Sequence, residues 1–338
     1  MTRHPEQRRI RRTAAVLASV AIGLGGAGTP SAWAAVPSTT WTFTVSAAVA
    51  PSMVTEYGGM AALTAMVQSQ IATVADRFTT SLAPSTFHFT LLSVTQYTGT
   101  ASAQVAVPHP GSNLQVVYEE NPADQGGWFG DSQTILHNWT YQGQGDFAAW
   151  ATDGLVHEFG HFRGAVDEYG ENVLAASNPV DGGAFTAPTG IMSYPYDERA
   201  WSRYSADIIR ASGQSLYSGA PVVDKSFPKA FRVRALNKAG KAVTGAKVAL
   251  FGVAWFSNAV GTTPVMQGFT TSVGYYQIPH NPFAPGTAGT PWNLAYSNFL
   301  VRLTYGTTIK YFWMPLTKVG AAYFSAPASP YVLTFRVP

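Results

Sequence analysis

The charged residues of this chain are divided among three segments of different net charge. Residues 1–34 contain five arginines and one glutamate, whereas residues 35–224 contain five basic and seventeen acidic residues. Residues 225–338 contain eleven basic residues and no acidic residue. Charge asymmetry of this size indicates segments with separate folds or partners. The formal net charge of +3 is therefore a sum over three unlike pieces, and we expect a leader, an acidic domain and a basic domain.

The length and composition allow two folded domains and exclude several kinds of site. The chain has 338 residues, of which 46% are hydrophobic and 12% are charged. A domain usually takes about 100–200 residues, so the length suits two domains with a core each. The chain contains no cysteine. This excludes disulfide bonds, thiolate metal sites, a cysteine nucleophile and a cysteine-held zymogen latch.

The N-terminal segment has the pattern of an export signal. Four arginines within positions 8–12 precede an apolar run over residues 14–28, and the small-residue motif Ala32-Trp33-Ala34 follows. The pattern predicts a signal peptide over residues 1–34 and a secreted, extracellular protein, exported by either the Sec or the twin-arginine route. The alternative is an uncleaved amphipathic anchor. No later stretch has the about 20 apolar residues of a membrane-spanning helix, so we expect no span in the mature chain.

Hydrophobic periodicity predicts an α+β fold for residues 35–222. Alternating apolar and polar residues predict strands, and apolar residues three or four positions apart predict helices. The expected strands cover residues 40–46, 87–92, 114–118 and 133–139, and the expected helices cover residues 60–80, 147–162 and 205–216. This order predicts a mixed sheet with helices packed on it.

The character of the chain changes after Pro221. Short strands separated by Gly, Pro and Asn turns are expected at residues 231–236, 246–251, 274–279, 299–304, 309–313 and 331–335. Several short strands with regular turns are typical of a sandwich of two sheets. We therefore predict an all-β, Ig-like sandwich domain over residues 226–338.

A candidate metal site lies in the expected helix over residues 147–162. His157 and His161 are four residues apart, so both imidazoles project from one face and reach one metal ion. Glu158 follows the first histidine, where it can deprotonate a metal-bound water. Gly164 allows a sharp turn that returns Asp167 as third ligand. Three protein ligands and one water are typical of a catalytic zinc site.

Three alternatives to this interpretation stay open. The helix could carry two histidines that bind no metal, or the site could hold a metal without activity. Glu168 is the second choice for the third ligand. Structural calcium is a further candidate in the loops of Asp124 and Asp131 or of Asp181, where solvated turns are the simpler interpretation.

The segment resembles the metzincin zinc metallopeptidases, whose pattern is His-Glu-x-x-His-x-x-Gly-x-x-His/Asp followed by a methionine turn. The run Gly190-Ile191-Met192-Ser193-Tyr194 is similar to that turn. The resemblance implies an apolar floor under the metal at Met192 and, at Tyr194, a tyrosine that reaches the metal or the oxyanion. It also implies a metzincin-like mixed sheet. The Asp-Glu-Tyr run at 167–169 resembles the IgA-protease-like and chloride-channel-regulator metallopeptidases. The plainer interpretation of Met192 and Tyr194 is core and loop packing.

The activity implied by the resemblance is zinc-assisted peptide hydrolysis with one catalytic Zn²⁺. Glu158 would take a proton from the water and later give it to the leaving amine. Tyr194 would donate to the developing oxyanion. We expect a protein or peptide substrate, bound as an extended strand along the sheet edge near Gln133–Trp139.

The basic segment has two interpretations. Residues 231–279 resemble the carboxypeptidase-regulatory-like sandwiches. The basic residues either steer docking against the acidic domain or bind an anionic cell-surface polymer or glycan, with Arg302, Lys310, Tyr311 and Trp313 as candidates. We expect no nucleic-acid partner, because no recognition motif is present. We expect a monomeric endopeptidase. The alternative is a secreted binding protein with a vestigial protease domain.

Overall fold

The computed structural model describes residues 38–121, 126–138, 145–193, 198–214, 222–284 and 294–338. The predicted signal peptide lies outside these residues. Residues 37–338 form one compact unit. The unit has an α+β fold with three sheets, which confirms the predicted fold class. Below, residues 38–214 are called the N-terminal part and residues 222–338 the C-terminal part.

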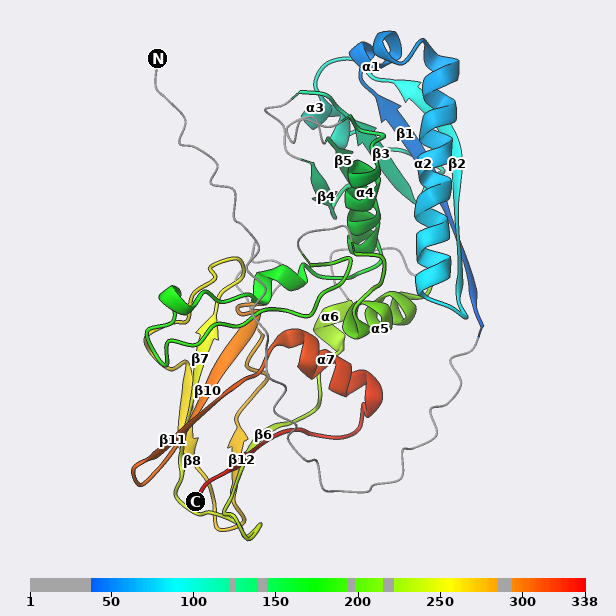
Figure 1. Cartoon of the computed structure of the whole chain (residues 1–338). Coiled ribbons are helices and arrows are strands. Elements are labelled where there is room, and N and C mark those ends of the chain that lie inside the picture. Colours follow the sequence, from blue (N-terminus) through cyan, green and yellow to red (C-terminus); the bar gives the residue numbers. More distant parts are fainter. Residues whose placement is uncertain (1–37, 122–125, 139–144, 194–197, 215–221, 285–293) are drawn as a thin grey trace, which may run out of the picture. The chain divides into compact units, whose positions relative to one another are not determined.

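The N-terminal part is built on a mixed five-stranded sheet (Figure 1). Its strands are β1 (Thr40–Val49), β2 (Thr86–Gln96), β3 (Leu114–Tyr118), β4 (Gly127–Phe129) and β5 (Thr134–His137). They lie in the order β2-β1-β3-β5-β4, and β4 alone runs antiparallel to its neighbour. The four predicted strands are confirmed. The edge strand β4 was not predicted, because three residues are too few to show a period of two.

Two long helices cover one face of this sheet, α2 (Met60–Ser81) and α4 (Ala149–Phe162). The buried side of α2 carries Leu63, Val67, Ile71, Val74 and Phe78, which is the predicted three-and-four spacing. Phe78 contacts Phe87 of β2, and Phe159 of α4 contacts Phe89 of the same strand. The remaining helices of this part are α1 (Pro51–Glu56), α3 (Ala101–Val105), α5 (Arg203–Ser212) and the 3₁₀ turns Glu168–Glu171 and Ala175–Ser177.

The C-terminal part contains two sheets with a shared apolar core. One has the order β11-β10-β7-β8 and the other β12-β6-β9. The strands are β6 (Phe231–Leu236), β7 (Lys247–Val253), β8 (Met266–Phe269), β9 (Tyr275–Ile278), β10 (Asn298–Tyr305), β11 (Thr308–Trp313) and β12 (Tyr331–Arg336). Val233, Leu250 and Val301 are buried in the core between the sheets.

Two helices also belong to the C-terminal part, the short α6 (Val222–Lys225) and α7 (Leu316–Ser325). The sequence pattern of this part predicts only strands. Helix α7 packs against α5, and Gly320 of α7 has no room for a side chain because the ring of Tyr204 lies against it. Packing against α5, a helix of the N-terminal part, thus helps to stabilise α7. The local sequence of α7 does not reveal this distant contact.

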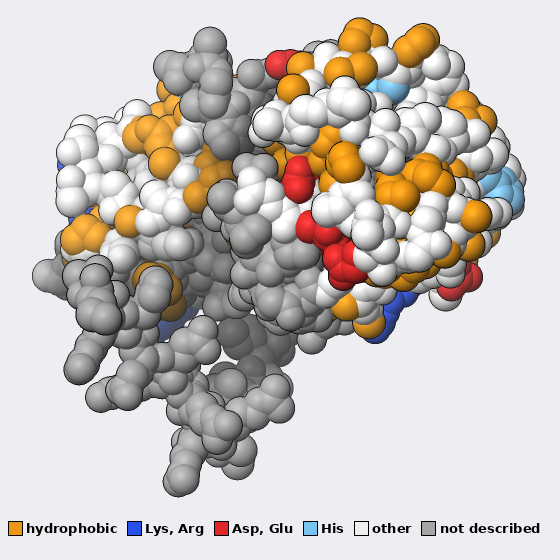
Figure 2. Space-filling view, turned by 90° about the horizontal axis from the view of Figure 1, so that it is seen from above, with side chains coloured by type: hydrophobic (Ala, Val, Ile, Leu, Met, Phe, Trp, Pro, Cys, Tyr) orange, Lys and Arg blue, Asp and Glu red, His pale blue; other side chains and the backbone are white. Residues whose placement is uncertain are grey.

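Apolar contacts and hydrogen bonds, rather than ion pairs, join the two parts among the described residues. Val166 and Ile208 of the N-terminal part belong to the same buried cluster as Leu316 and Val319 of α7. The ion pairs found among the described residues all lie within the N-terminal part. The face viewed in Figure 2 shows acidic side chains near its middle and basic ones only toward its margins. In the described residues, opposite charges therefore do not hold the parts together directly.

None of the described helices is both long and apolar enough to cross a membrane.

Candidate metal centre

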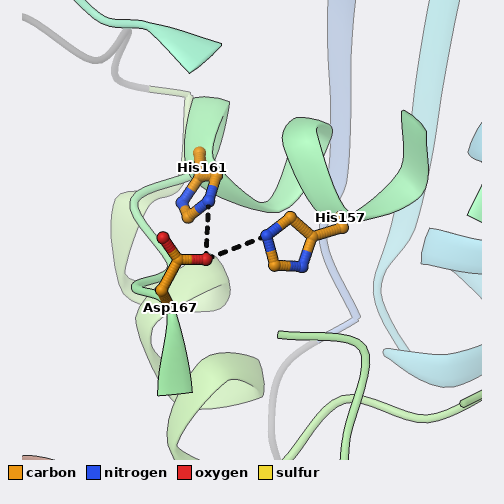
Figure 3. A group of neighbouring side chains, drawn as sticks. All are labelled: His157, His161 and Asp167. Atoms are coloured by element: carbon orange, nitrogen blue, oxygen red, sulfur yellow. Dashed lines mark hydrogen bonds and ion pairs between the residues drawn. The ribbon is translucent and has the colours of Figure 1, made fainter. Parts of the chain in front are cut away.

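Helix α4 carries both histidines of the motif on one buried face. His157 is 1% exposed and His161 is 6% exposed. Their Nε2 atoms lie 2.9 Å and 3.2 Å from the same oxygen, Oδ1 of Asp167 (Figure 3). The potential ligand atoms of the three residues all lie within 4.8 Å of one another. The structure thus places Asp167 with the two histidines, in the arrangement that the motif predicts.

A sharp turn at Gly164 returns the chain from α4 toward the histidines. Gly164 has a φ of +86°, a conformation that strains residues with a side chain. The Gly164 N–H donates to the carbonyl of His161 at 2.8 Å, and the Ala165 N–H donates to Gly160 at 2.9 Å. These two hydrogen bonds form a Schellman motif, which commonly ends helices. It confirms the role predicted for Gly164.

Hydrogen bonds on the far side of each ring orient the two imidazoles. Nδ1 of His157 lies 2.9 Å from the carbonyl oxygen of Ile191, and Nδ1 of His161 lies 2.9 Å from that of Ala165. A carbonyl oxygen only accepts, so Nδ1 carries the proton in both rings. With Nδ1 bonded on the far side, Nε2 of each ring faces Asp167. Metal-binding histidines are usually held in this way.

The donor set requires a cation. Two Nε2 lone pairs and a carboxylate oxygen that face one another at about hydrogen-bond distance repel unless a proton or a metal ion lies between them. Burial disfavours the charged form of His161, but the carboxylate of Asp167 outweighs burial and raises the pKa of His161 to about 9. Burial by itself would raise the pKa of Asp167, but the neighbouring imidazoles hold it well below its usual range. Two imidazoles and one carboxylate fit a divalent zinc ion.

The turn at residues 190–193 packs against α4 next to the histidines. The ideal position of a Cβ atom on Gly160 would lie 2.5 Å from Sδ of Met192, so glycine lets the turn approach α4 closely. Met192 is fully buried. Its carbonyl accepts a hydrogen bond from the N–H of Glu168 at 2.9 Å, and the preceding carbonyl, of Ile191, holds His157. The turn therefore contacts both the helix and the segment that carries Asp167.

Glu158 lies beside the two histidines. Burial raises the pKa of its carboxyl group, and the charges of His161 and His157 oppose that rise. The backbone N–H of Trp128 in β4 donates a hydrogen bond to this carboxyl group. The predicted base is thus held between the helix and the edge strand. Tyr194, the predicted oxyanion donor, lies outside the described residues.

Glu168 points to a different partner. Its carboxylate accepts hydrogen bonds from the hydroxyl groups of Ser202 and Ser205, at the start of α5. Burial raises the pKa of Glu168 to about 7, although the two serines oppose the rise. Glu168 is not part of the group of three potential ligands. The geometry favours Asp167 over Glu168 as third ligand.

The predicted position of the substrate-binding edge is wrong. Residues 134–137 form β5, which is paired with β3 on one side and with β4 on the other. The edge of the sheet nearest the site is β4, residues Gly127–Phe129, and Trp139 lies outside the described residues. The error follows from the shortness of β4, which made β5 look like the last strand.

Two further neighbours of the site were missed by sequence reasoning. The ring of Tyr169 stacks beside His157 with a centroid distance of 6.3 Å. It directly follows Asp167 and Glu168, so its position in the motif was an available signal. Trp128, whose N–H contacts Glu158, had no such signal, because a short strand brings it there from outside the motif.

The other candidate sites contact their own chain. The Asp181 carboxylate accepts hydrogen bonds from Asn178 and from the Gly183 N–H, as in an ordinary turn, and Asp124 lies outside the described residues. Of the candidates for polymer binding, Tyr311 donates to the carbonyl of Val180, and Trp313 contacts Phe185. The guanidinium group of Arg302 lies over the ring of Phe251.

No family model matches this sequence, and no curated protein matches it either. Among solved structures, the chain is similar to one described as "Structure of a chaperone-substrate complex". The similarity covers 52% of this chain and 35% of that chain, with 14% sequence identity and a TM-score of 0.36. A similarity of this size defines neither the fold nor the function.

Proposed function

We propose that this protein is a secreted zinc-dependent endopeptidase of the metzincin type. The observation that carries the proposal is the convergence of two imidazole nitrogens on one carboxylate oxygen, with Glu158 next to them on the helix. The residues support a catalytic site better than a structural one, because only three protein ligands converge among the described residues.

In the proposed reaction, the metal ion and the side chains of the protein have different roles. A bound zinc ion would lower the pKa of a water molecule and polarise the scissile carbonyl. Glu158 accepts the proton of that water and passes it to the leaving amine. His157 and His161 stay oriented by the carbonyl groups of Ile191 and Ala165.

The edge strand β4 is the place where the substrate would bind. One side of β4 pairs with β5, and no other described strand pairs with its outer side, along which an extended peptide would bind. Trp128 on this strand contacts Glu158, so a peptide along β4 would pass the base. Tyr194 remains our candidate for the donor to the oxyanion.

Hydrolysis of casein and of a broad peptide library tests the proposal. A chelator should abolish the activity and zinc should restore it. Glu158→Gln should lower the rate by about 10²–10⁴-fold, because it removes the general base and leaves the ligands in place. The variant should still bind zinc. Glu198→Gln, at an exposed glutamate, is the matched control.

Two outcomes would contradict the proposal. If Glu158→Gln cleaves peptides as fast as Glu198→Gln does, Glu158 is not the base. If the unaltered protein binds zinc but cleaves no member of the library, the alternative of a secreted binding protein is favoured instead.

A further inference from the structure

A buried glutamate joins the segment that carries Asp167 to the C-terminal part. Glu171 is fully buried and lies four residues after Asp167, in the 3₁₀ turn Glu168–Glu171. One oxygen of its carboxyl group accepts a hydrogen bond from the Thr317 N–H at 2.7 Å. The other oxygen lies 2.8 Å from the Thr317 hydroxyl. Both oxygens are thus occupied by one residue of α7.

The bond to Thr317 also completes helix α7. Thr317 is the second residue of this ten-residue helix, so its N–H has no partner within the helix. No side chain caps α7 locally, since its N-cap residue is Pro315. Glu171 therefore supplies from 146 residues away the cap that α7 lacks.

The neighbouring backbone is held by the same part of the molecule. The Ser297 hydroxyl donates to the carbonyl of Gly170 at 2.7 Å, and the Asn298 side chain donates to the carbonyl of Glu171 at 3.2 Å. A Cβ atom on Gly170 would lie 2.7 Å from the ring of Trp255, so the two approach as closely as glycine permits. The C-terminal part thus holds residues 170–171 by side chains from three separate segments.

The same turn sets the position of Asp167. The Gly170 N–H donates to the carbonyl of Asp167 at 3.0 Å, which makes Asp167 the residue that begins the turn. A shift of Gly170 and Glu171 would therefore move Asp167 relative to the histidines, which are fixed separately on α4. We infer that Glu171 and Thr317 are positioning residues for the third metal ligand, through which the C-terminal part adjusts the affinity for zinc. This inference rests on the proposed zinc site.

The matched pair Thr317→Val and Thr270→Val tests the inference in the full-length protein. Thr270 is a second buried threonine of the C-terminal part that both accepts and donates a hydrogen bond, at 3.0 Å from Ala246 N and 2.7 Å from Val243 O. Both substitutions should lower the unfolding temperature of the metal-free protein. Thr317→Val should raise the Kd for zinc roughly tenfold, the low end for an outer hydrogen-bond partner. Thr270→Val should leave it unchanged.

Two further variants distinguish positioning from loss of stability. Glu171→Leu should weaken zinc binding more than Thr317→Val does, and Thr317→Ser should restore the parent affinity. The absorption spectrum of the cobalt-loaded protein reports ligand geometry. We expect it to change in Thr317→Val and Glu171→Leu, and to be the same in Thr270→Val and the parent. Zinc affinity is measured by competition with a chromophoric chelator, so the test does not depend on peptidase activity.

The outcomes separate this inference from the proposed activity. Equal zinc affinities and equal cobalt spectra for Thr317→Val and Thr270→Val would overturn the inference, even if the protein is an active peptidase. A protein that binds zinc and is inert on peptides would contradict the proposed activity, and the affinities of the variants would still decide the inference. A parent protein that binds neither zinc nor cobalt overturns both.

Discussion

The two histidines and the aspartate of the candidate site are held in different ways. His157 and His161 lie one turn apart on α4, and the period of the helix alone puts them on one face. Asp167 follows the turn at Gly164 that ends α4. Its segment is held by the turn at 190–193, by α5 and by α7. Local geometry thus determines the positions of two candidate ligands, and the position of the third depends on contacts with distant segments.

The segment after α4 directs three acidic side chains to three partners. Asp167 faces the histidines, Glu168 faces the start of α5, and Glu171 faces the start of α7. All three are buried, yet the histidines lower the pKa of Asp167 while burial raises the pKa of the two glutamates. The neighbours, rather than the residue types, determine which of the three can serve as an anionic ligand.

The largest expected effect comes from Asp167→Ala compared with Glu168→Ala. Asp167→Ala should weaken zinc binding by more than about 100-fold, because loss of a ligand exceeds the roughly 10–100-fold effect of an outer partner. Glu168→Ala should weaken it less and should mainly lower stability, because Ser202 and Ser205 lose their acceptor. Zinc titration and thermal unfolding of the metal-free proteins measure both effects. An equal loss of affinity in the two variants would refute the distinction between them.

A smaller effect is expected from Glu171→Gln and depends on pH. Burial raises the pKa of Glu171 well above that of the unfolded chain. The folded protein therefore holds this proton more tightly, and the contribution of Glu171 to stability is lost as pH rises above the unfolded pKa. The slope is at most about 1.4 kcal/mol per pH unit for one group. Glutamine has no proton to lose, so the variant should gain stability relative to the parent as pH rises.

Urea unfolding of the metal-free parent and Glu171→Gln at pH 5 and pH 8 measures this difference. The amide can still accept from the Thr317 N–H and can donate to its hydroxyl group, so zinc affinity should be close to that of the parent. A difference in stability that is constant with pH would show that Glu171 does not titrate differently in the folded protein.

The smallest effect is expected from salt. Among the described residues, the two parts are joined by apolar contacts and by hydrogen bonds, and by no ion pair, despite the opposite charges of their sequences. At about 1 M salt, the Debye length falls to about 3 Å, and attraction between exposed charges is screened. The unfolding temperature should therefore change little between low salt and about 1 M NaCl. A marked fall would show that charge attraction holds the parts together, as one interpretation of the sequence expected.

Much of the fold was predictable because its elements are long and periodic. The buried side of α2 and the four longer strands of the first sheet lie where alternation and helical spacing put them. Strand β4 and helix α7 were missed for physical reasons. β4 has three residues, and α7 lacks a local cap and packs on a helix from the other part. Because β4 is so short, the sequence pattern wrongly predicts that residues 133–139 form the edge of the sheet.

The sequence by itself determined the pair of histidines, the glutamate beside them and the glycine that turns the chain. These follow from the geometry of one helix and from the positive φ at Gly164. Only the tertiary structure decided between Asp167 and Glu168, because that choice depends on which way two adjacent side chains point. The directions of these side chains depend on contacts with Met192, Ser202 and Thr317. These residues lie 25 to 150 positions after Asp167, and the fold brings them to the segment that carries Asp167 and Glu168. The local sequence does not show which distant residues will contact a segment. The choice of the third candidate ligand therefore depends on the complete tertiary structure.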